Sequence, residues 1–276
     1  MSERITAKIF DFFITTKCTM NCKLCAAAVP YNPKPRHTPK EIAFRELSEF
    51  FQIWDYAERV EFIGGEPLMH PDIYDIVKET MKYSNQFDRM RITTNATIVP
   101  SDELLSFIAD CGKPFDFIVD DYGKHSKNLN RLVEKLETYG IEHRIDVYHG
   151  ETQRFDGWVC FGDYTDLAYS EEEWHKVFER CIAPKNAFTC VNDGKAFACC
   201  YAMSLYWVNG FLADDGSYVD LFDDGSSIEK KRETAANFNK QPLAACRCCH
   251  GFDSENGKRY PAAEQLPKIM GGNVHE

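Results

Sequence analysis

Short apolar runs alternate with amphipathic segments through the first 150 residues, and this alternation constrains the fold more than any other feature of the chain. Five apolar runs are predicted strands, at residues 7–15, 59–63, 88–94, 115–120 and 143–148. Four predicted helices lie between them, beginning near residues 38 and 71 and covering residues 101–111 and 127–139. This order predicts an α/β fold on a parallel sheet, whose ligands bind at the carboxyl ends of the strands.

The first predicted helix has a start signal and an apolar face. Thr38 and Glu41 match a capping box in which Pro39 takes the first helical position. Apolar side chains recur three and four residues apart, at Leu47, Phe50, Phe51 and Trp54. The pattern predicts an amphipathic helix.

The regular alternation stops at about residue 150. Eight of the twelve cysteines lie beyond this point, at irregular spacing. We therefore predict one domain over residues 1–150, a cysteine-rich domain over residues 151–265 and a flexible tail over residues 266–276.

Charge and hydropathy exclude several classes of partner. Lys and Arg number 32 against 43 Asp and Glu, and the net charge of −11 repels phosphate backbones and anionic lipids, so neither nucleic acid nor a membrane is an expected partner. The chain shows no secretory signal and no run approaching the ~18 apolar residues that span a bilayer. These features predict a cytoplasmic protein whose clustered cysteines bind metal rather than form disulfides.

Three cysteines, Cys18, Cys22 and Cys25, follow the first predicted strand at CxxxCxxC spacing. Three thiolates can hold three irons of a 4Fe–4S cluster and leave the fourth iron without a protein ligand. A zinc site is the alternative, with His37 as the nearby candidate for a fourth ligand. The spacing favours the iron–sulfur cluster.

The segment Gly64-Gly65-Glu66-Pro67 ends the next predicted strand. The glycines let a ligand approach the backbone, and the carboxylate can accept hydrogen bonds from an ammonium group. Such a segment alone is most often a simple turn. Its combination with CxxxCxxC, in this order on successive strands, is a specific signal.

Together the two motifs resemble those of the radical S-adenosylmethionine (SAM) superfamily, over about residues 7–150. The resemblance implies a partial (β/α) barrel of parallel strands, here shortened to five strands and four helices. It implies that Cys18, Cys22 and Cys25 hold a 4Fe–4S cluster whose open iron binds SAM. The SAM-binding residues that it implies are Leu24, Gly64, Gly65, Glu66, Thr94, Asn95 and Asp120.

A second predicted metal site consists of Cys181, Cys199, Cys246 and Cys249, the last two at CxxC spacing. Four thiolates can ligate a whole 4Fe–4S cluster, and four-cysteine zinc is the alternative. These residues resemble the twitch domain of radical SAM enzymes, a shorter relative of the SPASM domain. That resemblance implies a β-hairpin and one auxiliary 4Fe–4S cluster, and it leaves open the roles of Cys190, Cys200 and Cys248.

The resemblance also implies a reaction. Members cleave SAM reductively to a 5′-deoxyadenosyl radical that abstracts hydrogen from a C–H bond. The layout is most similar to radical SAM dehydrogenases of aminocyclitol alcohols. We therefore expect oxidation of a carbohydrate or aminocyclitol alcohol, with the auxiliary cluster as electron acceptor and an external one-electron reductant such as flavodoxin or ferredoxin.

Candidate catalytic groups lie on and after the fifth predicted strand. His149 suits a general base, and Arg144 and Tyr164 are further polar candidates. Arg144 and Asp146 share one face of the strand, so they can equally form a structural ion pair. Trp158 is either a wall of a sugar-binding pocket or a core residue.

Three alternatives stay open. The same groups could serve a redox-neutral radical epimerase or dehydratase. A second alternative is a peptide-modifying radical SAM enzyme, although only 17 residues precede Cys18, which favours a small substrate over one with a leader peptide. The third is a non-enzymatic electron-transfer module, which would leave the Gly64–Pro67 segment and an open cluster without a use.

Overall fold

The computed structural model describes residues 4–152, 158–253 and 256–267. The first half contains β1 (Thr6–Thr15), α1 (Lys40–Ile53), β2 (Tyr56–Gly64), α2 (Ile73–Thr80), β3 (Phe87–Thr94), α3 (Asp102–Asp110), β4 (Phe115–Asp121), α4 (Leu129–Thr138) and β5 (Glu142–Val147). The second half contains α5 (Glu171–Arg180), α6 (Ile182–Asn186), β6 (Phe188–Asn192), β7 (Lys195–Phe197), α7 (Cys200–Asn209), β8 (Tyr218–Asp220) and α8 (Ile228–Ala236). Within these ranges no helix is both long and apolar enough to cross a membrane.

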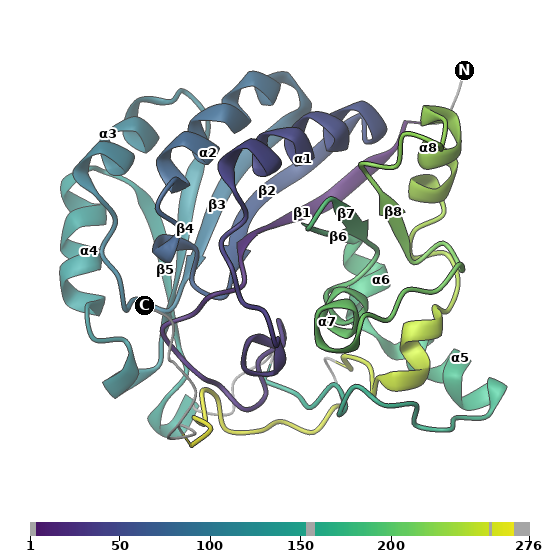
Figure 1. The fold of residues 1–276 in the computed structure, drawn as a ribbon. Helices are drawn as coiled ribbons and strands as arrows, with labels where there is room; N and C mark the ends of the chain where they lie inside the picture. Colours follow the sequence, from purple (N-terminus) through teal and green to yellow (C-terminus); the bar gives the residue numbers. More distant parts are fainter. Residues whose placement is uncertain (1–3, 153–157, 254–255, 268–276) are drawn as a thin grey trace.

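The eight strands found in the described residues form one sheet, in the order β5-β4-β3-β2-β1-β6-β7-β8. Neighbouring strands from β5 to β6 run parallel, whereas β7 and β8 are antiparallel additions at one end. The sheet is curved and open, and α1 to α4 cover its outer face (Figure 1). The prediction of an α/β partial barrel of parallel strands is confirmed.

The sheet continues beyond the five parallel strands expected from the first half. β6 pairs with β1, with Phe188 opposite Ile9, and adds a sixth parallel strand. β6 and β7 form a β-hairpin whose loop residues Asp193 and Gly194 have φ angles of 57° and 70°. Two positive φ angles are what a two-residue type I′ turn requires. The domain boundary near residue 150 stays a prediction, and residues 268–276 of the predicted tail lie outside the described residues.

From Phe10 onward strand β1 is mainly apolar, with Asp11 as a buried polar exception, because both of its faces are covered there. Phe10 and Phe12 belong to the core beneath the outer helices, and the Phe10 ring stacks on Phe50 of α1 with 3.8 Å between ring centroids. Phe13 points to the opposite face and joins a second core with residues of β7 and α7. A strand buried on both faces has no alternation to reveal its orientation, as is usual in parallel sheets.

The start of α1 differs from the sequence prediction. Pro39, not Thr38, is the N-cap, and no side chain caps this end. Thr38 is hydrogen-bonded to the sheet instead. Its N–H donates to the Ile14 carbonyl at 2.9 Å, and its hydroxyl accepts from the Asn192 amide at 3.1 Å. The tertiary contacts of Thr38 therefore override the local capping signal. The predicted apolar face is confirmed, since Leu47, Phe50, Phe51 and Trp54 are buried.

Candidate functional site

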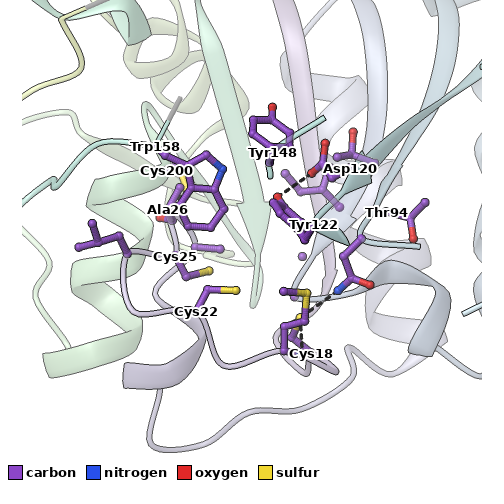
Figure 2. Close-up of a pocket in the computed structure, with 18 of the residues that line it drawn as sticks. Cys18, Cys22, Cys25, Ala26, Thr94, Asp120, Tyr122, Tyr148, Trp158 and Cys200 are labelled. Carbon is purple, nitrogen blue, oxygen red and sulfur yellow. Dashed lines mark hydrogen bonds between the residues drawn. The ribbon is translucent and has the colours of Figure 1, made fainter. Parts of the chain in front are cut away.

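A cavity of about 300 Å³ opens at the carboxyl ends of the parallel strands. The loop after β1 brings Cys18, Cys22 and Cys25 to one side of this cavity (Figure 2). Other lining residues that were predicted from sequence are Leu24, Gly64, Gly65, Thr94, Asn95 and Asp120. The structure therefore assembles nearly the whole predicted first site around one space.

Gly64 and Gly65 are needed because the β1 loop lies directly on their backbone. A Cβ on Gly64 would lie 2.1 Å from the Thr15 carbonyl oxygen, and a Cβ on Gly65 would lie 2.1 Å from that of Lys17. The N–H of Gly65 donates to Thr15 and that of Glu66 donates to Lys17, both at 2.9 Å. This pairing continues the β1–β2 contact past the strands and holds the cysteine loop against the turn.

Glu66 is the one predicted SAM-binding residue that does not line the cavity within the described part of the chain. Its carboxylate is fully buried and accepts from the N–H of Leu68 at 3.1 Å, the hydroxyl of Thr94 at 2.8 Å and the N–H of Asn95 at 2.9 Å. Burial raises its pKa to about 7, against the lowering effect of these donors. Glu66 thus ties the glycine turn to the end of β3.

The three cysteines of the first site are partly exposed, and desolvation of their thiols raises the pKa of each, that of Cys22 to about 12. N–H groups nevertheless point at two of the sulfurs. The Met20 N–H lies 3.4 Å from Cys18 Sγ, and the Gln265 side-chain amide lies 3.2 Å from Cys22 Sγ. Such donors stabilise the thiolate, the form that ligates iron, so the donor set fits an iron–sulfur cluster.

The opposite side of the cavity is polar and aromatic, and it was only partly visible in the sequence. The Tyr122 hydroxyl donates to Asp120 Oδ2 at 3.0 Å, and burial raises the pKa of Asp120 to about 7. The Tyr122 ring stacks on Tyr148 and meets Trp158 edge-on, at centroid distances of 5.3 and 5.7 Å. Figure 2 shows Tyr122, Tyr148 and Asp120 together, to the right of Cys22 and Cys25, with Trp158 above Cys25. For Tyr122 and Tyr148, the available signal was their position directly after β4 and β5.

The predicted catalytic residues lie outside the described lining of this cavity. Arg144 forms a bidentate pair with Asp146, at 2.8 Å for each contact, and its side chain is 64% exposed. His149 Nε2 lies 3.0 Å from Asp121 Oδ2. Tyr164 lines an adjoining cavity of about 180 Å³, which it shares with Leu24 and Cys25.

The four cysteines of the predicted second site come together from three separate segments. A backbone N–H lies within 3.4 Å of each of three sulfurs: Ala202 N at Cys199, Gly251 N at Cys249 and Phe252 N at Cys181. Burial raises the pKa of Cys199, and the nearby Cys246 and Cys181 raise it further. Among the described residues, no three His, Cys, Asp or Glu side chains converge on a single-ion site.

The three cysteines left open in the sequence occupy distinct places. Cys190 is buried, with its thiol 3.8 Å from Asp11 Oδ2. Cys200 lines the main cavity, and its thiol donates to the Ala26 carbonyl at 3.3 Å. Cys248 is buried beside the second site, and its carbonyl accepts from the Tyr201 hydroxyl at 2.6 Å.

The amino-acid sequence of this chain is similar to those of several known proteins. The family model described as "Radical SAM superfamily" matches residues 12–154. GTP 3′,8-cyclase of Campylobacter jejuni subsp. doylei is 27% identical over 135 residues, which are 48% of this chain and 34% of the cyclase. GTP 3′,8-cyclase of Sulfurovum sp. is 27% identical over 89 residues, or 32% of this chain and 26% of that enzyme. The matched region thus spans about a third of these relatives or less.

Two solved structures share the fold over nearly the whole chain. BtrN in complex with AdoMet and 2-DOIA superposes with a TM-score of 0.52 at 16% identity, covering 94% of this chain and 98% of that chain. Native anSMEcpe with bound AdoMet and the Cp18Cys peptide gives a TM-score of 0.52 at 13% identity, with coverage of 93% and 92%. At these identities the likeness is one of fold.

Proposed function

This chain belongs to the radical SAM superfamily, and from that premise we propose that it dehydrogenates an alcohol of a small carbohydrate or aminocyclitol. Cys18, Cys22 and Cys25 would hold the SAM-binding 4Fe–4S cluster. Cys181, Cys199, Cys246 and Cys249 would hold an auxiliary 4Fe–4S cluster in a twitch domain. When bound, SAM and the two clusters supply a hydrogen-abstracting radical and an acceptor for the second substrate electron.

The proposed substrate class rests on the charged groups that line the cavity. Its described lining holds one carboxyl group, that of Asp120, and neither Lys nor Arg. A carboxyl group in a largely apolar wall suits an ammonium or hydroxyl group and offers no partner to a triphosphate. Tyr122, Tyr148 and Trp158 add aromatic faces beside it. The lining therefore favours an amino sugar or aminocyclitol over a nucleoside triphosphate.

We also propose Asp120 as the proton acceptor for the substrate hydroxyl, in place of the SAM contact that the family resemblance implied for it. It faces the cavity, whereas His149 contacts Asp121 outside the described lining. The Tyr122 hydroxyl holds one carboxyl oxygen in place, which leaves the other available to a ligand. The aromatic side chains would exclude water from the reacting carbon.

The similar proteins suggest alternative classes of substrate. The BtrN complex contains 2-DOIA, whereas the anSMEcpe complex contains a peptide and the curated relatives are named for GTP cyclisation. A redox-neutral epimerase or dehydratase could use the same cavity without a net electron acceptor. The reductant is proposed to be a flavodoxin or ferredoxin, and clusters with free cysteines suit a reducing compartment such as the cytoplasm.

Iron and sulfide content after anaerobic reconstitution tests the cofactor assignment. We expect about eight irons per chain in the wild type and about four when Cys18, Cys22 and Cys25 are all replaced by Ala. Four or fewer irons in the wild type, with zinc retained after the triple replacement, would make the second site a structural zinc site. The proposed electron acceptor would then be lost.

Deuterium transfer tests the reaction. The reconstituted protein, SAM and a strong reductant are incubated with aminocyclitols and sugars deuterated at carbinol carbons, and separately with GTP and with peptides. We expect deuterium in 5′-deoxyadenosine and a ketone product from an aminocyclitol or sugar. Transfer from GTP or a peptide alone would refute the proposed substrate class, and return of an isomer without ketone would favour epimerisation.

A further inference from the structure

The last described segment of the chain lies along the cysteine loop that follows β1. Residues 263–266, here called the C-terminal strap, form an antiparallel bridge between Gln265 and Cys22. The Lys23 N–H donates to the Glu264 carbonyl at 2.8 Å, and the Leu266 N–H donates to the Asn21 carbonyl at 2.8 Å. The strap therefore acts as an added strand on the loop that carries the cluster ligands.

The side chain of Gln265 is fixed by this pairing. Its Oε1 accepts from the Asn21 N–H at 2.8 Å, which determines which end of the amide is the oxygen. The NH₂ group then donates to the Ala263 carbonyl at 2.8 Å and to Cys22 Sγ at 3.2 Å. Both amide protons and the oxygen are used, so the donor is held pointing at the sulfur.

A hydrogen bond to a cysteine sulfur changes the electronic properties of a cluster that the sulfur ligates. The donor stabilises the negative charge on the thiolate, and the reduced cluster carries more of that charge than the oxidised one. Hydrogen bonds to the sulfurs are accordingly one of the factors that set the reduction potential of iron–sulfur clusters. At Cys18 the donors are the Met20 N–H, a backbone group that mutation cannot remove, and the Asn95 side-chain amide, which is more distant at 3.5 Å.

We propose that Gln265 is a positioning residue that raises the reduction potential of the first cluster through its hydrogen bond to Cys22, so that the C-terminal strap tunes how readily the enzyme starts its reaction. This inference rests on the proposed function only in that Cys22 ligates an open 4Fe–4S cluster. It assigns a role to a residue 243 positions away in the sequence that carries no motif.

Two variants of Gln265 distinguish an effect on the reduction potential of the first cluster from a purely structural role in holding the loop. Gln265→Met keeps the length of the side chain but has no donor, and Gln265→Glu keeps the oxygen facing Asn21 but replaces the donor with a charged oxygen. The matched control is Glu264→Gln, which removes the 3.7 Å ion pair with Lys23 and leaves the strap backbone unchanged. The readout is an EPR-monitored redox titration of the reconstituted protein, in which the first cluster is recognised by its spectral change on addition of SAM.

At a fixed applied potential, we expect the ratio of reduced to oxidised first cluster to fall several-fold in Gln265→Met and about tenfold in Gln265→Glu, where tenfold corresponds to ~59 mV for one electron. Glu264→Gln should titrate like the wild type. Lower iron occupancy with an unchanged potential in both Gln265 variants would overturn the proposal and leave Gln265 a purely structural role.

A measurement on the wild type covers the case in which neither variant retains the cluster. With ¹⁵N in the glutamine side-chain amides, the reduced first cluster should show a hyperfine coupling to nitrogen. Absence of the coupling would overturn the inference about Gln265. Absence of an open cluster from the wild type, seen as fewer irons and no spectral response to SAM, would instead refute the proposed function.

Discussion

Asp120 illustrates how burial prepares a single side chain for chemistry. Its carboxyl group lies between strand β4 and the cavity, where desolvation raises its pKa to about 7 and the Tyr122 hydroxyl partly opposes that rise. A proton acceptor works best when its pKa is near the working pH. At the same strand end, His149 is paired with Asp121 and its side chain is 48% exposed.

We predict that Asp120→Asn lowers product formation by about 10²–10³-fold, because the amide keeps the shape but cannot accept a proton. His149→Ala should change turnover by less than about threefold. The measurement is the rate of ketone formation beside the rate of SAM cleavage without substrate, which Asp120→Asn should leave nearly intact. If His149→Ala abolishes turnover and Asp120→Asn does not, the general base is His149, as the sequence suggested.

Gly65 is required because a side chain at this position would collide with the cysteine loop. A methyl group there would meet the Lys17 carbonyl at 2.1 Å and Cys18 Cβ at 2.9 Å. We predict that Gly65→Ala displaces the cysteine loop and lowers the iron bound at the first site by at least half. Gly225→Ala is the control, because its Cβ would approach only the Asp223 side chain, at 3.1 Å. Equal iron content in the two variants would show that the loop does not need this contact.

At the scale of elements, helix α1 and the β6–β7 hairpin are joined through one buried carboxyl group. Glu46 of α1 accepts the N–H of Gly194 in the hairpin turn at 2.7 Å, and its Oε2 has no partner among the described residues. Burial raises the pKa of Glu46 to about 8. The group is therefore neutral in the folded protein at pH 7 and ionised in the unfolded chain.

This linkage predicts a pH dependence with a definite sign. Between the ordinary pKa of 4.5 and about 8, the folded state binds more protons than the unfolded state, so the unfolding free energy falls as the pH rises. Each unit of the window costs about 1.4 kcal/mol at most from this group. Glu46→Gln keeps an oxygen for Gly194 and cannot ionise.

Urea denaturation at several pH values measures the effect as the difference between the wild type and Glu46→Gln. We expect the wild type to lose stability relative to the variant as the pH rises from 5 to 8, and the difference to level off above the folded pKa. A difference that does not change with pH would mean that Glu46 titrates normally and that water reaches it.

At the scale of the whole molecule, the second cysteine set is distributed over the chain and depends on the complete fold. Cys181 follows α5, Cys199 precedes α7, and Cys246 and Cys249 lie in the segment after α8. These segments meet, since the Phe252 N–H lies 3.4 Å from Cys181 Sγ and Cys199, Cys246 and Cys249 pack in the same core. The same segments attach to the main sheet through the pairing of β6 with β1.

We predict that Cys199→Ala removes about four of eight irons while the first cluster still responds to SAM, because the two sites use separate loops. Cys111→Ala is the control, since Cys111 caps the end of α3, donates to the Lys113 carbonyl at 3.6 Å and belongs to neither cysteine set, so the iron content should be unchanged. Iron analysis and EPR spectra with and without SAM measure both. Retention of all iron in Cys199→Ala would assign the ligand role to another thiol, such as Cys248.

The sequence by itself determined the features that arise from neighbours along the chain. The order of strands and helices over the first 150 residues, the apolar face of α1 and the β1 loop with its three cysteines follow from local periodicity and short spacings. The need for glycine at positions 64 and 65 was also readable, although the group that approaches them is the backbone of Thr15 and Lys17, where a ligand was expected.

Only the tertiary structure decided which distant groups meet. Parallel strands place all their carboxyl ends at one edge, so that edge collects Asp120, Tyr122 and Tyr148 beside the cysteine loop, although no motif links them. The same packing gives the Glu66 carboxylate its hydrogen-bond donors from the end of β3 and places the Gln265 amide beside Cys22 Sγ. These contacts depend on how segments that are distant in the sequence pack together, and local sequence patterns do not determine such long-range contacts.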